Sequence, residues 1–222
     1  MKLLSIILLF AFNSCDSSST KNRLTCDELN IKTTELIDRY YVTDVKTYID
    51  STLILLNEGI KSCDDYRKLF SLRKLGVLSL KNDYEQAISF IDTIDESLFV
   101  SAPYYLEVIE FRFKAAQHFY HGDPVSGNYY LKKIVALLGN FLKENEKELN
   151  ALLSQSEISV ILQNEMSTAF IQHANYHALL NGREKTANHI NTMFKSNEWN
   201  MEFYDMILNF IDNEDILIFM GV

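Results

Sequence analysis

Two histidines four residues apart are the strongest candidates for chemistry in this chain. The stretch HANYH places His173 and His177 on one face of a helix, where both imidazoles could bind the same metal ion. A third ligand is missing nearby, and no glutamate stands between them as in zinc hydrolases. We therefore predict no metal site, and a metal-dependent hydrolase using the His173/His177 pair remains an alternative.

Other catalytic signatures are absent from the sequence. It contains no Gly-x-Ser-x-Gly motif for a serine nucleophile and no glycine-rich loop for phosphates. The acidic pair Asp64-Asp65 fits the start of a helix, where negative charge is favourable. We expect a protein that needs no cofactor and catalyses no reaction.

The first cysteine follows an apolar N-terminal segment. After Met1 and Lys2 come ten uncharged residues, LLSIILLFAF, which are too few to cross a bilayer as a helix and are typical of a secretion signal. The segment up to Cys15, with the small residue Ser14 before it, resembles the lipobox of bacterial lipoproteins. The resemblance implies that residues 1–14 are removed as a signal peptide and that Cys15 is acylated.

An acylated Cys15 would hold the chain at a membrane of the bacterial cell envelope, facing the periplasm or the surface. Residues 15–24 are polar and serine-rich, which is typical of a flexible tether, and the folded part would span 25–222. An ordinary cleaved signal with Cys15 incidental, or a retained N-terminal anchor, are the alternatives. Both also place the folded part outside the cytoplasm.

The charge balance excludes some partners. Removing residues 1–14 takes away one lysine and leaves 208 residues with 20 basic and 30 acidic side chains. That length suits one domain or an elongated repeat array. Nucleic acids and anionic lipids both require clustered lysine and arginine, so we expect neither to be a partner.

The two remaining cysteines make a pairable number in an oxidising compartment. If residues 27–41 form a helix and 44–58 return antiparallel to it, Cys26 and Cys63 flank the same end of the hairpin. We predict a disulfide between them. Two buried free thiols are the alternative.

The body of the chain predicts an all-α fold. Its two prolines and seven glycines fall at joints, between segments whose apolar residues recur every three or four positions. Asp123-Pro124 is a strong helix start. The expected capping boxes are Thr25 to Glu28 and Ser154 to Glu157, and the expected helix ends are Gly59 and Gly139.

The expected helices form antiparallel pairs that repeat along the chain. The segments from Leu78, His118 and Ala178 align, each with a short polar turn followed by a small residue and an apolar face. The small residues are Ala87, Gly127 and Ala187, and each would let two helices approach closely. Such pairs cannot bury their faces alone, so they stack.

The second pair resembles a tetratricopeptide repeat. It carries the Leu75-Gly76, Tyr84, Ala87 and Phe90 that this family uses for packing, although the distance from Gly76 to Ala87 is one residue short. The resemblance implies a tetratricopeptide-repeat-like α-solenoid whose concave face binds a protein or peptide. The segment 198–222, with its apolar ILIFM, would cap the array.

The expected function is that of an adaptor or scaffold. Aromatic and arginine side chains are the usual anchors of protein interfaces, and the expected groove residues are Arg112, Phe119, Gln172 and Tyr176. A further alternative is a toxin-neutralising immunity-type lipoprotein, whose acidic surface would suit a basic target.

Overall fold

The computed structural model describes residues 24–193 and 199–212. Within these residues the chain is helical and has no β-strand, which confirms the predicted all-α class. The elements are α1 (Cys26–Thr43), α2 (Lys46–Ser62), the 3₁₀ helix η1 (Asp64–Tyr66), α3 (Arg67–Leu80), α4 (Tyr84–Ile91), the 3₁₀ helix η2 (Glu96–Phe99), α5 (Tyr105–Tyr120), α6 (Pro124–Glu144), α7 (Glu146–Leu153), α8 (Ile158–Leu162), α9 (Glu165–Asn181), α10 (Arg183–Met193) and α11 (Met201–Asp212). None of the described helices combines the length and apolar character that a membrane span requires.

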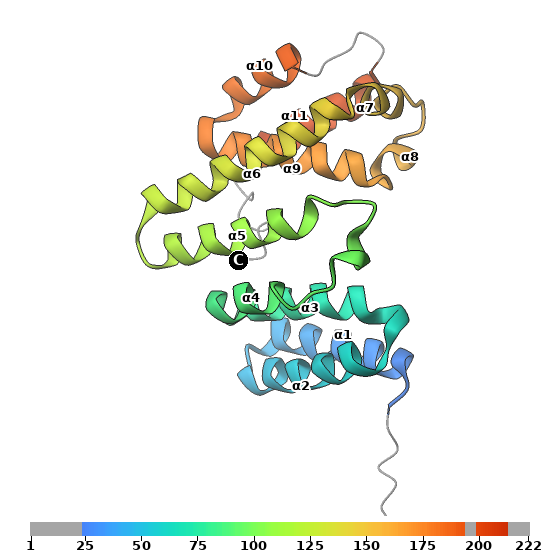
Figure 1. Cartoon of the computed structure of the whole chain (residues 1–222), viewed down its shortest axis with the longest axis vertical. Helices are drawn as coiled ribbons and strands as arrows, with labels where there is room; N and C mark the ends of the chain where they lie inside the picture. The colour runs from blue at the N-terminus through green and yellow to red at the C-terminus, as the bar shows by residue number, and fades with distance from the viewer. Residues whose placement is uncertain (1–23, 194–198, 213–222) are drawn as a thin grey trace, which may run out of the picture.

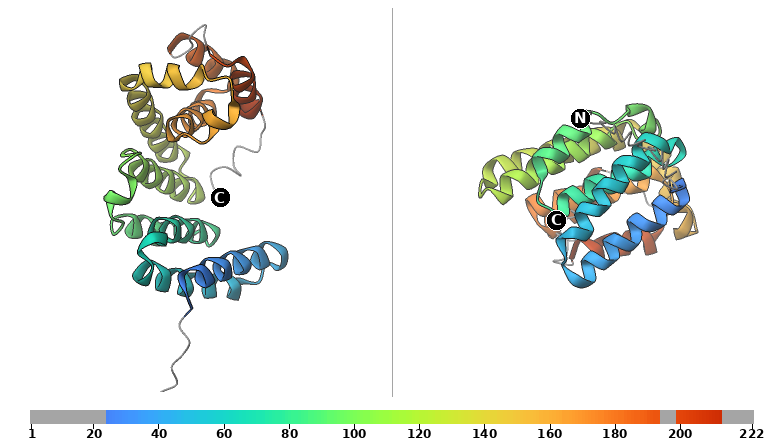
Figure 2. Two further views of the ribbon diagram at one scale, coloured as in Figure 1. Left: turned by 90° about the vertical axis from the view of Figure 1, so that its right-hand side faces the viewer. Right: turned by 90° about the horizontal axis from the view of Figure 1, so that it is seen from below.

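The helices stack in the order of the chain (Figure 1). Each of α1 to α6 packs on the next, and α9 packs on α6. Three core clusters follow one another along the described stack, and partly buried side chains join them. Leu53 packs against the first and second clusters, and Tyr105 packs against the second and third. A side view at right angles to the first shows the same progression from α1 to α11 (Figure 2, left).

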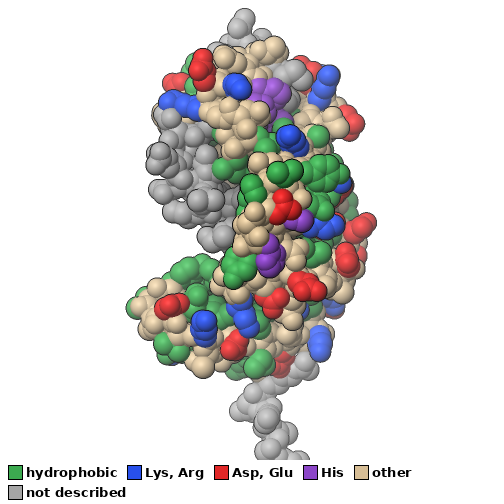
Figure 3. Space-filling view, turned by 90° about the vertical axis from the view of Figure 1, so that its left-hand side faces the viewer, with side chains coloured by type: hydrophobic (Ala, Val, Ile, Leu, Met, Phe, Trp, Pro, Cys, Tyr) green, Lys and Arg blue, Asp and Glu red, His purple; other side chains and the backbone are tan. Residues whose placement is uncertain are grey.

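The molecule is hollowed on one side between its two ends (Figure 3). On the face shown, acidic and basic side chains are interspersed, and no continuous basic stripe is visible.

Two predicted helix starts are confirmed. Thr25 and Glu28 form the capping box, in which the Thr25 amide donates to the Glu28 carboxylate at 2.7 Å and Thr25 Oγ1 accepts from the Glu28 amide at 3.3 Å. Asp123 Oδ1 accepts from the Ser126 amide at 3.1 Å, with Pro124 in the first turn. Both caps pair amides that a helix start leaves unpaired.

The predicted capping box at Ser154 to Glu157 is wrong. Helix α7 ends at Leu153, and α8 begins at Ile158 without a side-chain cap. The residues instead form the short connection between two helices. A capping box needs a helix directly after it, which this spacing alone does not guarantee.

The predicted helix ends at Gly59 and Gly139 are also wrong, because both glycines lie inside helices. Gly59 is buried in α2, where an added Cβ would lie 2.5 Å from the Phe70 ring of α3. Gly139 lies within α6, where a Cβ would lie 3.1 Å from the His173 ring of α9. Each glycine allows a ring from the next helix to touch the backbone.

The residues that carry the tetratricopeptide resemblance are mostly buried. Leu75, Tyr84 and Ala87 lie in the second core cluster, and Phe90 packs against it. Gly76 is different: it is exposed, and a Cβ there would meet nothing within 4 Å. Gly76 therefore serves no close approach in this fold.

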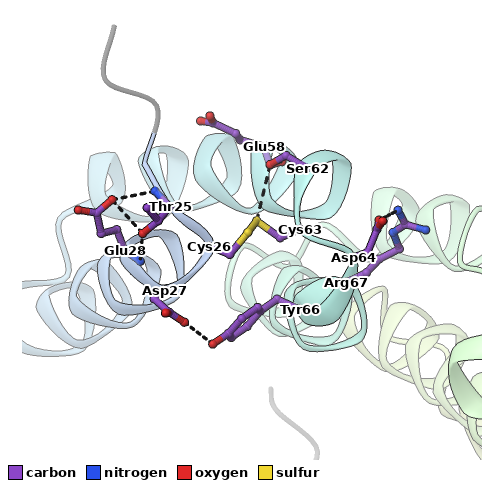
Figure 4. The surroundings of a disulfide bond; sticks show 10 residues. All are labelled: Thr25, Cys26, Asp27, Glu28, Glu58, Ser62, Cys63, Asp64, Tyr66 and Arg67. Carbon is purple, nitrogen blue, oxygen red and sulfur yellow. Dashed lines mark hydrogen bonds and ion pairs between the residues drawn. A yellow bond between two sulfur atoms is a disulfide. The ribbon is translucent and has the colours of Figure 1, made fainter.

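Cys26 and Cys63 lie at disulfide distance, as the hairpin geometry predicts (Figure 4). Their Cα atoms are 5.7 Å apart, and the bridge joins the start of α1 to the end of α2. The Tyr66 hydroxyl donates to Asp27 beside the bridge, so η1 is held to α1 as well.

The last described helix covers the C-terminal side of the stack. Phe203 of α11 is fully buried and lies beside Phe170 of α9, while the Trp199 indole donates to Asn150 Oδ1 at 2.7 Å. This part of the expected 198–222 cap packs onto the core. Its ILIFM segment lies outside the described residues.

Gly59→Ala should lower the free energy of unfolding by about 1–3 kcal/mol, because the methyl group would overlap the fully buried Phe70 ring. This loss should exceed the gain of about 1 kcal/mol from the higher helix propensity of alanine. Gly76→Ala is the matched control, since open space surrounds it and only the gain applies. Urea unfolding measures both, and equal stabilities would refute the close contact.

Replacing both bridged cysteines, as Cys26→Ser/Cys63→Ser, should lower the free energy of unfolding by about 4 kcal/mol, because the bridge closes a loop of sequence separation 37. Urea unfolding of this variant and of the wild type measures the loss. Adding reductant should destabilise the wild type toward the variant and leave the variant unchanged. A wild type insensitive to reductant would show that the two sulfurs are not bonded.

Candidate functional site

Helix α9 is the most enclosed helix of the described structure. Helices α6, α7, α8, α10 and α11 all contact it, and it has eight buried residues. Several of these are polar, among them His173, Asn175 and Tyr176. Because buried polar groups need partners, the pairing of these side chains shows what α9 can do.

Two of the predicted groove residues lie together between α5 and α9. The Arg112 guanidinium forms a hydrogen bond with the buried Tyr176 side chain. Burial raises the pKa of Tyr176, and the charge of Arg112 opposes that rise. The pair therefore places a cation beside a neutral phenol on the side of α9 that faces α5.

The predicted residue Gln172 lies one turn before Tyr176 and lacks a hydrogen-bond partner for its buried amide oxygen. The amide oxygen of Asn175, three residues after Gln172, also lacks a hydrogen-bond partner. Asn175 is only 7% exposed. A buried acceptor without a donor costs about 1–3 kcal/mol. Among the described residues, these two oxygens are the buried side-chain atoms that lack a hydrogen-bond partner.

A cavity of about 170 Å³ is lined in part by Thr168, which lies one turn before Gln172 on α9. Its apolar lining includes Leu72, Phe99 and Tyr105, while Thr168 of α9 lies on its wall. Lys68 and Glu165 stand at its polar side, with Nζ 3.8 Å from the carboxylate. Helices α3, α5 and α9 thus share one cavity.

We call the residues around the cavity and the unpaired oxygens the α9 strip. Its α9 members recur every three or four residues, so they lie on one side of the helix. The strip consists of Glu165, Thr168, Gln172, Asn175 and Tyr176 on α9, with Tyr105 and Arg112 on α5.

The described structure has other cavities, and charged groups in them have partners, as Lys68 and Glu165 do. One, of about 330 Å³, includes Asp50 and Lys81, which form an ion pair at 2.8 Å. Another, of about 510 Å³, includes Lys74, which lies 3.7 Å from the centroid of the Phe90 ring. Neither contains a buried side-chain atom without a partner.

Phe119 does not join the α9 strip. Its ring lies over Gly127 at the start of α6, where a Cβ would come within 2.7 Å of it. Phe119 therefore packs the α5–α6 hairpin at its turn. The predicted lipidation site, Cys15, lies outside the described residues.

The two candidate histidines meet a third, His189 of α10. His173 Nε2 lies 3.1 Å from His189 Nε2, and the His177 and His189 rings stack with centroids 4.3 Å apart. The sequence prediction missed His189. His189 lies seven residues after Gly182, whereas His177 lies five and His173 nine residues before it, so exact reflection across the turn pairs it with neither.

Hydrogen bonds assign the protons of this cluster. His173 Nδ1 lies 3.1 Å from the Val135 carbonyl, which only accepts, so Nδ1 carries the proton and Nε2 accepts from His189. His177 Nδ1 lies 2.8 Å from Thr186 Oγ1, whose hydrogen goes to the Gly182 carbonyl. His177 therefore donates to Thr186, and neutral imidazoles link α10 to α9.

The three histidines do not form a metal centre in this arrangement. The stacked His177 and His189 rings are inclined by only 10°, so their in-plane lone pairs run in nearly parallel planes and do not converge. Within residues 24–193 and 199–212, no group of three or more histidine, cysteine, aspartate or glutamate side chains could hold a metal ion. The described geometry gives the hydrolase alternative no support.

Acid should destabilise the fold through His173. Burial, followed by the neighbouring His189 and His177, lowers the pKa of His173 to about 4. Between this value and the ordinary pKa of about 6.5, the unfolded chain binds the extra proton and the folded chain does not. The free energy of unfolding therefore decreases as the pH is lowered through this window. His173 alone accounts for a loss of about 2 kcal/mol between about pH 7.5 and about pH 5.

Urea unfolding of wild type and His173→Gln at both pH values isolates this contribution, because all other groups titrate in both proteins. On acidification, the free energy of unfolding of His173→Gln should decrease by about 2 kcal/mol less than that of the wild type. His121→Gln, which replaces an exposed histidine, is the matched control and should follow the wild type. Identical pH dependence in wild type and His173→Gln would contradict the neutral cluster.

Comparison of the whole chain with protein-family models, with curated proteins and with solved structures finds no match. Functional conclusions therefore depend on the α9 strip and on the sequence.

Proposed function

We propose that this chain is a lipid-anchored helical-repeat protein of the bacterial cell envelope that binds an extended segment of a protein partner and catalyses no reaction. The anchor is the acylated Cys15, on the strength of the apolar segment and Ser14 before it. The binding site is the α9 strip. The observation that carries the proposal is the pair of unpaired amide oxygens of Gln172 and Asn175.

Contacts between alternate helices support a tetratricopeptide-like solenoid. Arg73 of α3 donates to the Asn30 carbonyl of α1 at 3.1 Å and to Thr33 Oγ1 at 2.6 Å. Arg112 of α5 pairs with Tyr176 of α9. The first helices of successive hairpins would thus form an inner layer, and α9 and α5 would present the strip on its concave side.

The chemistry of the strip suits a peptide backbone. A side-chain amide carries an acceptor and two donors, so it can pair with the N–H and C=O groups of an extended chain. Gln172 and Asn175 lie about one turn apart, and each needs a donor. Arg112 supplies a cation for an acidic side chain of the partner, and arginine and tyrosine are the usual anchors of interfaces.

The size of the cavity argues for a side chain rather than a small-molecule ligand. Its volume of about 170 Å³ is below the roughly 300–1,000 Å³ that small-molecule sites occupy. The apolar walls from Leu72, Phe99 and Tyr105 suit one aliphatic or aromatic group. A partner would insert this group beside Thr168 and lay its backbone along Gln172.

Selection of random displayed peptides on the purified chain tests the proposal. Selected peptides should share one apolar residue next to an acidic one, and Gln172→Ala should weaken their binding about tenfold, because a backbone donor loses its acceptor. The same variant should unfold at unchanged or higher urea, since it removes an unsatisfied oxygen.

Gln86→Ala on α4 is the matched control, as Gln86 is exposed and remote from the strip. It should leave peptide affinity unchanged. Failure to enrich any peptide, or equal binding by wild type and Gln172→Ala, would contradict the proposed site.

A further inference from the structure

Helix α10 is held to α9 by few side chains, and histidines are prominent among the contacts. Among the described side chains of α10, Thr186 and Ile190 are the buried ones. Ile190 lies in a core cluster, while Thr186 bonds to His177 and His189 bonds to His173. The docking of α10 therefore depends on the histidines of α9 as well as on one apolar side chain.

Helix α10 joins α9 through a single residue. Gly182 separates Asn181, the last residue of α9, from Arg183, the first residue of α10, and its φ is +82°. Glycine adopts this conformation without strain, and an added Cβ would meet nothing within 4 Å. Gly182 is therefore a pivot about which α10 can swing as a unit.

The contacts between the three rings tolerate one extra proton and not two. The Nε2 atoms of His173 and His189, 3.1 Å apart, share one hydrogen, so a proton on each ring would leave two N–H groups facing each other. The ring centroids of His177 lie 4.3 Å from those of His189 and 6.2 Å from those of His173. A second proton therefore sets two positive rings beside each other wherever it binds.

The groups that surround the rings do not stabilise this charge in the described structure. From α6, His173 meets the Val135 carbonyl, and from α11 the Tyr204 hydroxyl donates to Asn191 of α10. The described charged side chains on the helices packed around the rings are exposed, apart from Lys133, which lies over the Phe111 ring; they include Lys132 on α6, Arg183, Glu184 and Lys185 on α10, and Glu202 and Asp205 on α11.

We propose that α10 is an acid-released latch, which a second proton on the His173–His177–His189 cluster detaches from α9 while α1 to α6 stay folded. The inference goes beyond partner binding and does not depend on it. Release returns the histidines toward their ordinary pKa of about 6.5, so the released state binds more protons and acid favours it. Its population should rise at least about tenfold from about pH 7.5 to about pH 5, which is the effect of one proton over one pH unit.

Hydrogen exchange of the full chain at these two pH values, corrected for the intrinsic exchange rate, tests the latch. The α10 amides should exchange at least about tenfold faster at the lower pH. Low urea should not change their rate, because release exposes little surface, whereas the α6 amides should exchange more slowly and respond to urea. Equal corrected α10 rates at both pH values, or α10 and α6 amides with the same rate and urea dependence, overturn the inference.

The variant His173→Gln/His189→Gln removes the bonded pair of protonation sites and leaves amides that can bond to each other at any pH. Its α10 amides should lose most of the pH effect, whereas His121→Gln, at an exposed position, is the matched control and should follow the wild type. Helix content and Trp199 fluorescence at about pH 7.5 verify the fold. His177→Gln, which keeps the bonded pair, should reduce the effect if the double variant does not dock α10. A pH effect as large as that of the wild type in both variants overturns the inference.

Discussion

The enclosure of α9 is the constraint on which the rest of the molecule depends. A helix contacted by five others buries eight of its 17 residues, so each buried polar atom on it needs a partner inside the protein. Ser167 does so by donating to the Asn164 carbonyl, and His173 by donating to that of Val135. The amide oxygens of Gln172 and Asn175 do not, which is why the unsatisfied polarity of the described structure gathers on one side of this helix.

Small residues set the distances at which the helices stack. Gly139 brings α6 against the His173 ring, and Gly59 brings α2 against Phe70. The same contact at Gly139 buries His173, so close packing and the lowered pKa of this histidine have one origin. A helix at either end of the stack has one neighbouring helix fewer than a helix inside it. The Cys26–Cys63 bridge joins α1 to α2 at one end, and α11 covers α9 at the other.

Local chemistry was predictable from the sequence, and long-range contact was not. Thr25 and Asp123 cap helices through bonds spanning three residues, as their spacing predicts, whereas the same spacing at Ser154 caps no helix. The Cys26–Cys63 juxtaposition needed only the assumption of one hairpin. Gly59 and Gly139 failed because a glycine that ends a helix and one that admits a neighbouring ring look identical in the sequence, and only the fold supplies the ring. His189 and Asn175 became candidates only when the packing of α9 was known.

The unpaired oxygens on α9 also bear on what the protein is for. Each costs about 1–3 kcal/mol in the free chain, a large share of a typical stability of about 5–15 kcal/mol. A helix whose only task was to fill the core would gain by carrying apolar side chains at both positions, as it does at Phe170 and Ala174. On the proposed function, a chain that leaves two acceptors unpaired would be less stable with the strip empty than with the strip filled. The two unpaired oxygens that destabilise the free protein would then strengthen binding. A ligand that donates a hydrogen bond to each oxygen would remove the cost of leaving it unpaired.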